Sequence, residues 1–301
     1  MAVLAAESIS PAWAAESAMD VMCEPCGIVQ TEDGSFLVTD TYHKLIWKVV
    51  NRESTIYAGG HTVEDPYGEP LGGYHDATLE FSYFKEPWAI VPYLDGYAVS
   101  DAANDVVRLI RADHTQTVNS STQENLLIGT GVKYSRPTGL AADEEGSLYI
   151  ADTNNHAIRK ITKTGQVTTY AENLLEPTGL CYKNGTLYVA ESGAHRILRI
   201  VGGQVEVIAG DGNEGNADGM AFLAQFSSPQ GVAVSDDGII YVSDTGNNAV
   251  RKIQDGTVTT LIACDQTQMQ PYPIAPMGLM VRENLLYVCD RFSRKVFVLE
   301  R

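Results

Sequence analysis

The stretch of sequence that decides the fold is Ser147-Leu-Tyr-Ile-Ala-Asp-Thr-Asn-Asn-His-Ala-Ile-Arg-Lys-Ile161. Its two apolar ends, residues 148–151 and 157–161, have the β-branched and aromatic composition of short strands. Between them lies a polar turn that begins with Asp152, whose carboxylate can accept hydrogen bonds from backbone N–H groups just ahead in the chain. The stretch therefore predicts two antiparallel strands joined by a tight turn.

The same pattern occurs six times along the chain, and each copy carries an acidic residue at the start of its turn. These turn acids are Asp40, Asp101, Asp152, Glu191, Asp244 and Asp290. A proline precedes every copy, and the six are Pro25, Pro87, Pro137, Pro177, Pro229 and Pro276. Glycine turns such as Asp236-Asp-Gly238 and Asp255-Gly256 divide each repeat into four short antiparallel strands. Four strands repeated around an axis predict an all-β fold, a six-bladed β-propeller.

The motif resembles that of the NHL-repeat family, which ends in Asp-x-x-Asn-x-x-Ile-Arg-Lys-Ile. The copies that begin at Asp152 and Asp244 match it closely, and the resemblance extends from about residue 23 to residue 300. It implies a six-bladed NHL propeller. Two loops, residues 73–87 and 215–229, share one register and resemble the long NHL loop that packs an aromatic side chain under a single helical turn. The first, second, fourth and sixth copies depart from the motif at the Asn or Lys positions, so we expect their turns to differ.

The domain organisation follows from counting strands. Residues 23–301 supply the propeller, but the sixth repeat contains only three strands before the chain reaches Arg301. An unpaired sheet edge is a liability, so we expect the N-terminal segment, residues 1–22, to supply the missing outer strand from within Val3–Ala15. That strand would join the first and last blades.

Composition limits the possible partners. The formal net charge of −17 disfavours nucleic acid and anionic membrane surfaces, which attract Lys- and Arg-rich proteins. No run of 18 apolar residues is present, so we expect no membrane insertion. We expect a monomer, located outside the cell or at its surface. Ala12-Trp13-Ala14 has the form of an export cleavage site, although no long apolar segment precedes it.

The residues that flank the prolines are the candidate binding site, because the innermost strands of a propeller begin around its central channel. We expect the ligand-binding side chains at the channel mouth to be Glu24, Glu86, Trp88, Arg136, Glu176 and Gln230. A structural interpretation competes with this one, since Glu and Arg at a repeated surface position can neutralise one another. The six turn acids, in contrast, are expected to be structural backbone caps.

No complete catalytic or metal set can be assembled from the motifs. The resemblance to amidating-lyase propellers implies zinc bound by histidines at blade starts, but none of these positions here is His. Gluconolactonase-type propellers bind a divalent cation through Glu, Asn and Asp; Glu24, Glu86 and Glu176 are available here, without the Asn and Asp. Cys23-Glu-Pro-Cys26 has redox-motif spacing but begins a strand, so a local disulfide or two unreactive thiols are expected. We therefore expect no cofactor.

Three functions remain open from the sequence. The favoured one is a non-catalytic binding propeller whose loop-rich face, with Tyr67, Tyr74, Tyr83 and Trp88, meets a protein, peptide or glycan. The alternative is a metal-assisted hydrolase or lyase using the carboxylates of Glu24, Glu86 and Glu176. RNA binding, known for other NHL domains, relies on a basic face and fits this acidic chain poorly.

Overall fold

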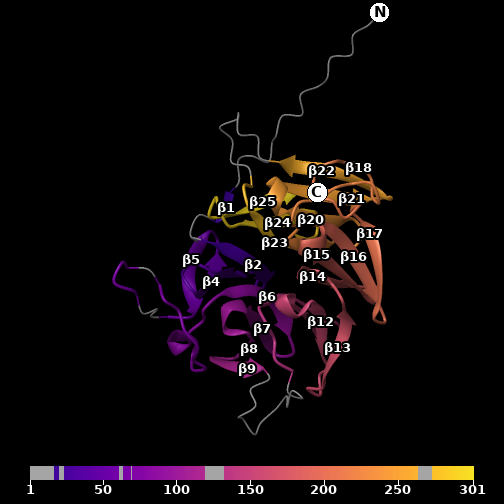
Figure 1. Ribbon diagram of the computed structural model, residues 1–301. Coiled ribbons are helices and arrows are strands. Elements are labelled where there is room, and N and C mark those ends of the chain that lie inside the picture. Colours follow the sequence, from indigo (N-terminus) through magenta and orange to yellow (C-terminus); the bar gives the residue numbers. More distant parts are fainter. Residues whose placement is uncertain (1–16, 20–23, 61–63, 69, 119–131, 264–272) are drawn as a thin grey trace, which may run out of the picture.

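The computed structural model describes residues 17–19, 24–60, 64–68, 70–118, 132–263 and 273–301. In this part of the chain six antiparallel sheets are arranged in a ring, with helical structure limited to three-residue 3-10 helices (Figure 1). None of these helices is long and apolar enough to cross a membrane. The prediction of a six-bladed propeller with four strands per blade is confirmed.

The strands of each blade are described from the channel outward. The innermost strands are β2 (Pro25–Gln30), β6 (Pro87–Tyr93), β10 (Pro137–Ala142), β14 (Pro177–Lys183), β19 (Gly231–Val234) and β23 (Pro276–Arg282). The second strands are β3 (Phe36–Asp40), β7 (Gly96–Asp101), β11 (Leu148–Asp152), β15 (Thr186–Glu191), β20 (Ile240–Asp244) and β24 (Leu285–Asp290). The third strands are β4 (Leu45–Val50), β8 (Val106–Arg111), β12 (Ala157–Ile161), β16 (Arg196–Val201), β21 (Ala249–Gln254) and β25 (Lys295–Glu300). The outer strands are β5 (Glu53–Ala58), β9 (His114–Val118), β13 (Val167–Glu172), β17 (Gln204–Ala209), β22 (Thr257–Ala263) and β1 (Ser17–Met19).

The ring is closed by a strand from the N-terminal segment. Strand β1 pairs antiparallel with β25, with Ser17 opposite Phe297 and Met19 opposite Val296. The sixth blade therefore contains strands from both ends of the chain, in the order β1-β25-β24-β23. Closure by an N-terminal strand is confirmed. The range predicted for it, residues 3–15, lies outside the described residues, and the pairing seen here is made by residues 17–19.

Each blade buries the carboxylate at the start of its second-to-third strand turn. All six turn acids have no exposed surface, and each accepts a hydrogen bond from a backbone N–H just before the proline region of its own blade. The donors are Glu24 to Asp40 (3.3 Å), Glu86 to Asp101 (2.9 Å), Ser135 to Asp152 (2.8 Å), Leu175 to Glu191 (2.7 Å), Ser227 to Asp244 (2.7 Å) and Ala275 to Asp290 (2.8 Å). This confirms their structural role: they fix where the inner strand begins.

The turns after these acids differ less than the sequence suggests. Four of them form a 3-10 helix: η2 (Ala102–Asn104), η3 (Thr153–Asn155), η4 (Ser192–Ala194) and η5 (Thr245–Asn247). The expected difference is thus wrong for the second and fourth copies and is confirmed for the first and sixth, which have plain turns. The common feature is a left-handed residue four positions after the acid, from Lys44 (φ 65°) in the first blade to Arg294 (φ 62°) in the last.

Neighbouring blades are linked by side-chain hydroxyls near the channel. Thr39 donates to the Trp88 carbonyl (2.8 Å), and Ser100 donates to the Thr138 carbonyl (2.5 Å). Two threonines at other repeat positions also link blades: Thr178, just after its own blade's proline, donates to the Pro229 carbonyl (3.1 Å), and Thr245, just after a turn acid, donates to the Pro276 carbonyl (2.5 Å). Each bond runs from one blade to the next and contributes about 1 kcal/mol.

Glycine two residues after the proline allows the inner strands to approach one another this closely. A Cβ atom on Gly139 would lie 1.9 Å from the Thr178 carbonyl oxygen, and one on Gly231 would lie 2.1 Å from that of Met277. In the second blade Ala89 occupies this position. The close approach, rather than an unusual backbone conformation, accounts for the glycines.

The two long loops anchor on buried arginines. Arg108 in β8 donates to Asp76 (2.8 Å) and lies over the Phe84 ring, while Arg251 in β21 pairs with Asp218 (2.6 Å) and lies over the Phe226 ring. Both rings are fully buried, which confirms the aromatic predicted for each loop. The first loop contains the expected single helical turn, η1 (Leu79–Phe81), whereas the second has a simple turn at residues 221–223.

These loops also cover the outer edges of the blades that follow them. In the second blade, Thr115 of β9 donates to the Ala77 carbonyl (2.8 Å), and in the fifth, β18 (Gly219–Met220) pairs with β22. An exposed edge strand invites pairing with another chain. The loops therefore protect two of the six outer edges as well as contributing surface.

The inner-strand glycines generate a stability prediction. Gly139→Ala should lower the free energy of unfolding by about 2–3 kcal/mol, because its Cβ meets a backbone carbonyl that cannot move without shifting the next blade. Ala89→Gly at the equivalent position should cost only about 1 kcal/mol, from chain entropy and lost contact. Urea denaturation of both variants measures the difference. Equal effects would contradict the argument.

The pairing of Asp218 with Arg251 predicts a pH dependence. Although burial raises its pKa, hydrogen bonds from Thr260 and Arg251 outweigh that effect and hold the pKa of Asp218 below its usual value. Its contribution to stability is therefore present above the unfolded pKa of about 4 and is lost as the pH falls through the lower folded pKa. Asp218→Asn should destabilise by about 1–2 kcal/mol at pH 7, with the gap from wild type closing toward pH 2.

The control is Asp255→Asn, an exposed carboxylate in the β21–β22 hairpin. Asn tolerates the left-handed conformation of that position (φ 50°), so this variant should follow wild type at every pH. A constant gap between wild type and Asp218→Asn from pH 7 to pH 2 would show that the ion pair does not cause the effect.

Candidate functional site

Three of the six predicted channel-mouth side chains form one cluster. Arg136 binds Glu86 with two hydrogen bonds, Nη1 to Oε2 (2.9 Å) and Nη2 to Oε1 (2.6 Å), across the boundary between the second and third blades. The guanidinium also lies over the Trp88 ring, 5.3 Å from its centroid. All three side chains remain partly exposed. The cluster is a polar and aromatic patch in which the charges are already paired.

Glu24 has an arginine partner that the sequence reasoning missed. Arg291 donates from Nε to Glu24 Oε2 (2.8 Å) and approaches the same oxygen with Nη2 (2.6 Å), and Thr41 adds a hydrogen bond (3.1 Å). Glu24 begins the first blade and Arg291 follows the turn acid of the sixth, so this pair crosses the closing boundary of the ring. The sequence carried a signal for it: the other five turns place Thr, Ala or Ser where Arg291 stands.

The remaining two predicted residues lie apart from these pairs. Gln230 donates to the Ser192 hydroxyl (2.9 Å), which joins the fourth and fifth blades. The side chain of Glu176 is exposed, and its backbone N–H points toward His156 Nδ1 (3.4 Å). The structure thus places the three carboxylates in three different environments, two paired with arginine and one open to solvent.

Burial changes the pKa values of several acids and thiols in and beside the mouth. It raises the pKa of Asp101 and Asp244, although backbone and side-chain hydrogen bonds oppose the shift. Burial, together with the nearby Cys289, holds the pKa of the Cys26 thiol well above its usual value. Cys26 is a free thiol, so it is an unreactive core side chain, whereas Cys23 lies outside the described residues.

The described histidines serve the framework. His43 contacts Asp40 (2.7 Å), and His195 accepts a hydrogen bond from the Ser228 N–H (3.1 Å), which ties one blade's turn to the next blade's start. Within the described ranges, no group of three or more His, Cys, Asp or Glu side chains is placed so that it could hold a metal ion. His195 therefore links two blades, His43 bonds within its own blade, and neither side chain joins the mouth cluster.

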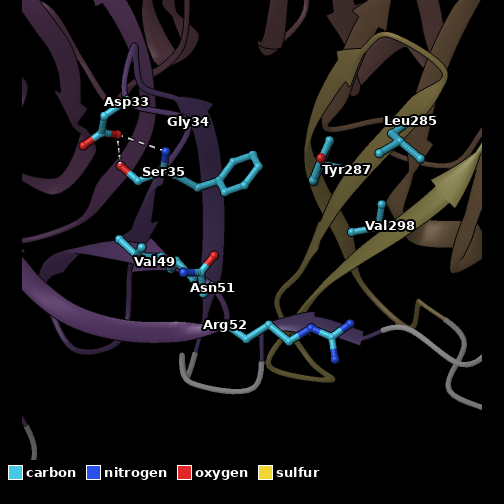
Figure 2. Close-up of a pocket in the computed structure, with 11 residues that line it drawn as sticks. Asp33, Gly34, Ser35, Val49, Asn51, Arg52, Leu285, Tyr287 and Val298 are labelled. Carbon is cyan, nitrogen blue, oxygen red and sulfur yellow. Dashed lines mark hydrogen bonds between the residues drawn. The ribbon is translucent and has the colours of Figure 1, made fainter.

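A cavity of about 530 Å³ lies between the first and sixth blades at their hairpin ends. Figure 2 shows Asp33, Ser35 and Val49 on one wall and Leu285, Tyr287 and Val298 on the other, with the Arg52 side chain extending toward the gap. Asp33 is held by Lys48 (2.8 Å) and Ser35 (2.6 Å), and Phe36 packs against Tyr287. Its single carboxylate is already bonded, so this opening presents no set of converging free groups.

The central channel contains the other cavities of interest. Trp88 and Gln230 line a narrow cavity of about 100 Å³ at the level of the inner-strand glycines. Toward the hairpin ends of the blades the channel widens into an aliphatic cavity of about 460 Å³. The sequence reasoning looked only at the proline end and missed this second opening, which the aliphatic residues three to five positions after each proline could have indicated.

Comparison with known proteins places the chain in a family. A family model of the Teneurin NHL domain matches residues 114–287, more than half of the chain. Teneurin-m of Drosophila melanogaster is 30% identical over 173 residues, which cover 50% of this chain and 6% of that protein. NHL repeat-containing protein 2 of Bos taurus is 46% identical over 68 residues, covering 22% of this chain and 9% of that protein. The chain thus matches less than a tenth of the length of either relative.

Solved structures share the fold at low sequence identity. A protein of unknown function from Bacteroides thetaiotaomicron superposes with a TM-score of 0.68 and 16% identity, covering 93% of this chain and 70% of that one. Virginiamycin B lyase from Staphylococcus aureus gives a TM-score of 0.61 and 12% identity, covering 93% and 95%. At such identities the likeness shows the fold alone. With the repeats, the ring of six blades and the family match in agreement, the chain belongs to the Teneurin NHL domain family of six-bladed β-propellers.

Proposed function

We propose that the chain is a non-catalytic binding propeller that presents its proline-side face to a protein, peptide or glycan ligand. The observation that carries the proposal is the pairing of charges at the channel mouth. Glu86 and Glu24 each hold an arginine from a neighbouring blade. A carboxylate engaged in this way is a poorer general base or metal ligand, because the guanidinium occupies its lone pairs and stabilises its charge.

The mouth instead offers the features of a recognition surface. Trp88 supplies a partly exposed aromatic face, Arg136 keeps about 40% of its side chain exposed, and Gln230 adds an amide. Tryptophan and arginine are the residues that most often dominate binding energy at interfaces. Paired charges that remain partly exposed to solvent can orient a polar partner and make its binding specific, without a catalytic step.

The loop aromatics contribute unequally to this face. Tyr67 is exposed over 90% of its surface, which leaves it available to a partner. Tyr74, although half-exposed, donates its hydroxyl to Thr117 (2.8 Å) and lies beside Arg108, and Tyr83 packs against the His75 ring. Two of the predicted loop aromatics therefore hold the first long loop in place, and the binding surface is centred on Trp88 and Arg136.

The alternative function is a metal-assisted hydrolase or lyase that uses Glu24, Glu86 and Glu176. The virginiamycin B lyase structure shows that the fold is shared with an enzyme. That function would require Arg136 and Arg291 to leave their carboxylates when the cation enters. We also propose that the protein acts as a monomer outside the cell or at its surface, which the binding role accommodates.

A binding experiment tests the proposal. Peptide-display and glycan-array selection on the purified chain should yield ligands whose affinity falls at least tenfold in Trp88→Ala and Arg136→Ala, because truncation of a central aromatic or arginine typically costs over 1 kcal/mol. Arg199→Ala is the matched control, since Arg199 also pairs with a glutamate, Glu206, but lies in β16 away from the mouth. Ligands that bind all three variants like wild type would place the site elsewhere.

A double-mutant cycle tests the pairing on which the proposal depends. Glu86→Gln and Arg136→Met, alone and combined, should give a coupling of about 1 kcal/mol in the free energy of unfolding, since the pair is bidentate and partly buried. The solvent-exposed Arg199–Glu206 pair should give about 0.3 kcal/mol.

Elemental mass spectrometry and melting curves with a chelator test the alternative function. A stoichiometric divalent ion whose removal lowers the melting temperature would favour the enzyme instead.

A further inference from the structure

The hairpin end of the central channel contains a cavity that differs in chemistry from the proline-side mouth. It has a volume of about 460 Å³, within the range of small-molecule sites. Where this cavity meets the narrower part of the channel, each blade contributes one aliphatic side chain to the wall. These six are Ile28, Ile90, Leu140, Leu180, Val232 and Leu279. The same six residues line the narrower cavity of about 100 Å³ beyond it, where the inner-strand glycines bring the backbones together. The cavity is a funnel that tapers into the channel, and we call it the hairpin-side funnel.

The rim of this funnel carries an uncompensated negative charge. Of the charged residues that line it, Asp143 is buried and bonded to the Ser147 N–H (2.6 Å) and to the Tyr149 hydroxyl (3.2 Å), with Lys160 at 3.5 Å. Lys183 pairs with Asp236. Glu144 is exposed, and no described residue forms an ion pair with it. The funnel therefore joins an apolar interior to one free carboxylate at its edge.

We propose that the hairpin-side funnel binds a small amphipathic cation: an aliphatic chain that enters the channel, with an ammonium head group held at the rim beside Glu144. Transfer of the chain from water to the aliphatic walls supplies most of the affinity, at about 0.8 kcal/mol for each buried CH₂. The net charge of −17 attracts a cation and repels an anion of the same shape. The narrowing of the funnel determines the orientation of the ligand, because only its aliphatic chain, and not its head group, fits between the inner-strand glycines.

The funnel wall contains its own reporter of occupancy. Cys181 is a free, half-buried thiol that lines the funnel, and burial raises its pKa to about 11. It should therefore react slowly with N-ethylmaleimide at pH 8, and a ligand seated in the funnel should slow it further. Cys289 is fully buried and lines neither cavity, so it is not expected to respond.

The test uses two probes with the same octyl chain and oppositely charged head groups, octyltrimethylammonium and octyl sulfate, titrated calorimetrically into the full chain below their micelle concentrations. The ammonium should bind at one site at least tenfold more tightly than the sulfate and should protect Cys181 from labelling, as read by peptide mass spectrometry. Glu144→Gln should weaken ammonium binding about threefold, the effect of one exposed charge. Glu145→Gln, the same change one residue further along the exposed hairpin, should leave it unchanged.

Two substitutions fill the funnel from different blades, Ala142→Trp and Val281→Trp, and either one that retains the wild-type melting temperature should abolish ammonium binding. Equal affinity for the two probes, no protection of Cys181, or unchanged binding in Glu144→Gln would each overturn the proposal. Because Arg136 lies at the other end of the channel and lines neither cavity, Arg136→Ala should bind octyltrimethylammonium like wild type. The outcome is thus independent of the function proposed for the proline side.

Discussion

The structure depends on six buried carboxylates. A carboxylate removed from water is costly unless hydrogen bonds replace the water, and each turn acid meets this requirement with backbone N–H groups from the start of its own inner strand. The bond therefore holds two distant parts of a repeat, 15 to 17 residues apart, in one position. Arg251 and Arg108 extend two of these caps outward to the long loops. Because each buried carboxylate must be hydrogen-bonded, this one group determines where the inner strand begins and which path the turn follows. In two blades it also determines where the long loop is anchored.

Repetition of this unit determines how the blades meet. Because every inner strand begins at the same level, hydroxyls such as Thr39 and Ser100 face the same carbonyl on the next blade. The third and fourth blades carry Ala151 and Ala190 at this position, and at the closing boundary Cys289 packs there in one buried cluster with Cys26. There the link is made instead by Arg291 with Glu24 at the mouth and by β1 with β25 at the outer edge. Ring closure and the chemistry of the mouth therefore share residues.

The two ends of the channel offer different chemistry to a ligand. The proline end carries partly exposed charges that are already paired and an aromatic ring beside them, which suits polar recognition. The hairpin end is aliphatic with a free carboxylate at its rim. Between them the glycines narrow the channel, so the two ends act as separate surfaces. A single ring of inner strands produces both, because each strand presents polar residues beside its proline and aliphatic ones further along.

The sequence by itself determined the six blades, the strand order within each blade and the structural role of the turn acids, because these depend on a local pattern repeated six times. It also indicated the residues at the channel mouth, including Glu86, Trp88 and Arg136. Only the tertiary structure decided which of them meet. The Glu86–Arg136 pair joins residues 50 positions apart in the sequence, and the Glu24–Arg291 pair joins residues 267 positions apart. The hairpin-side funnel likewise exists only once the ring closes. Pairings between blades depend on closure of the whole ring, and no local pattern in one repeat carries that information.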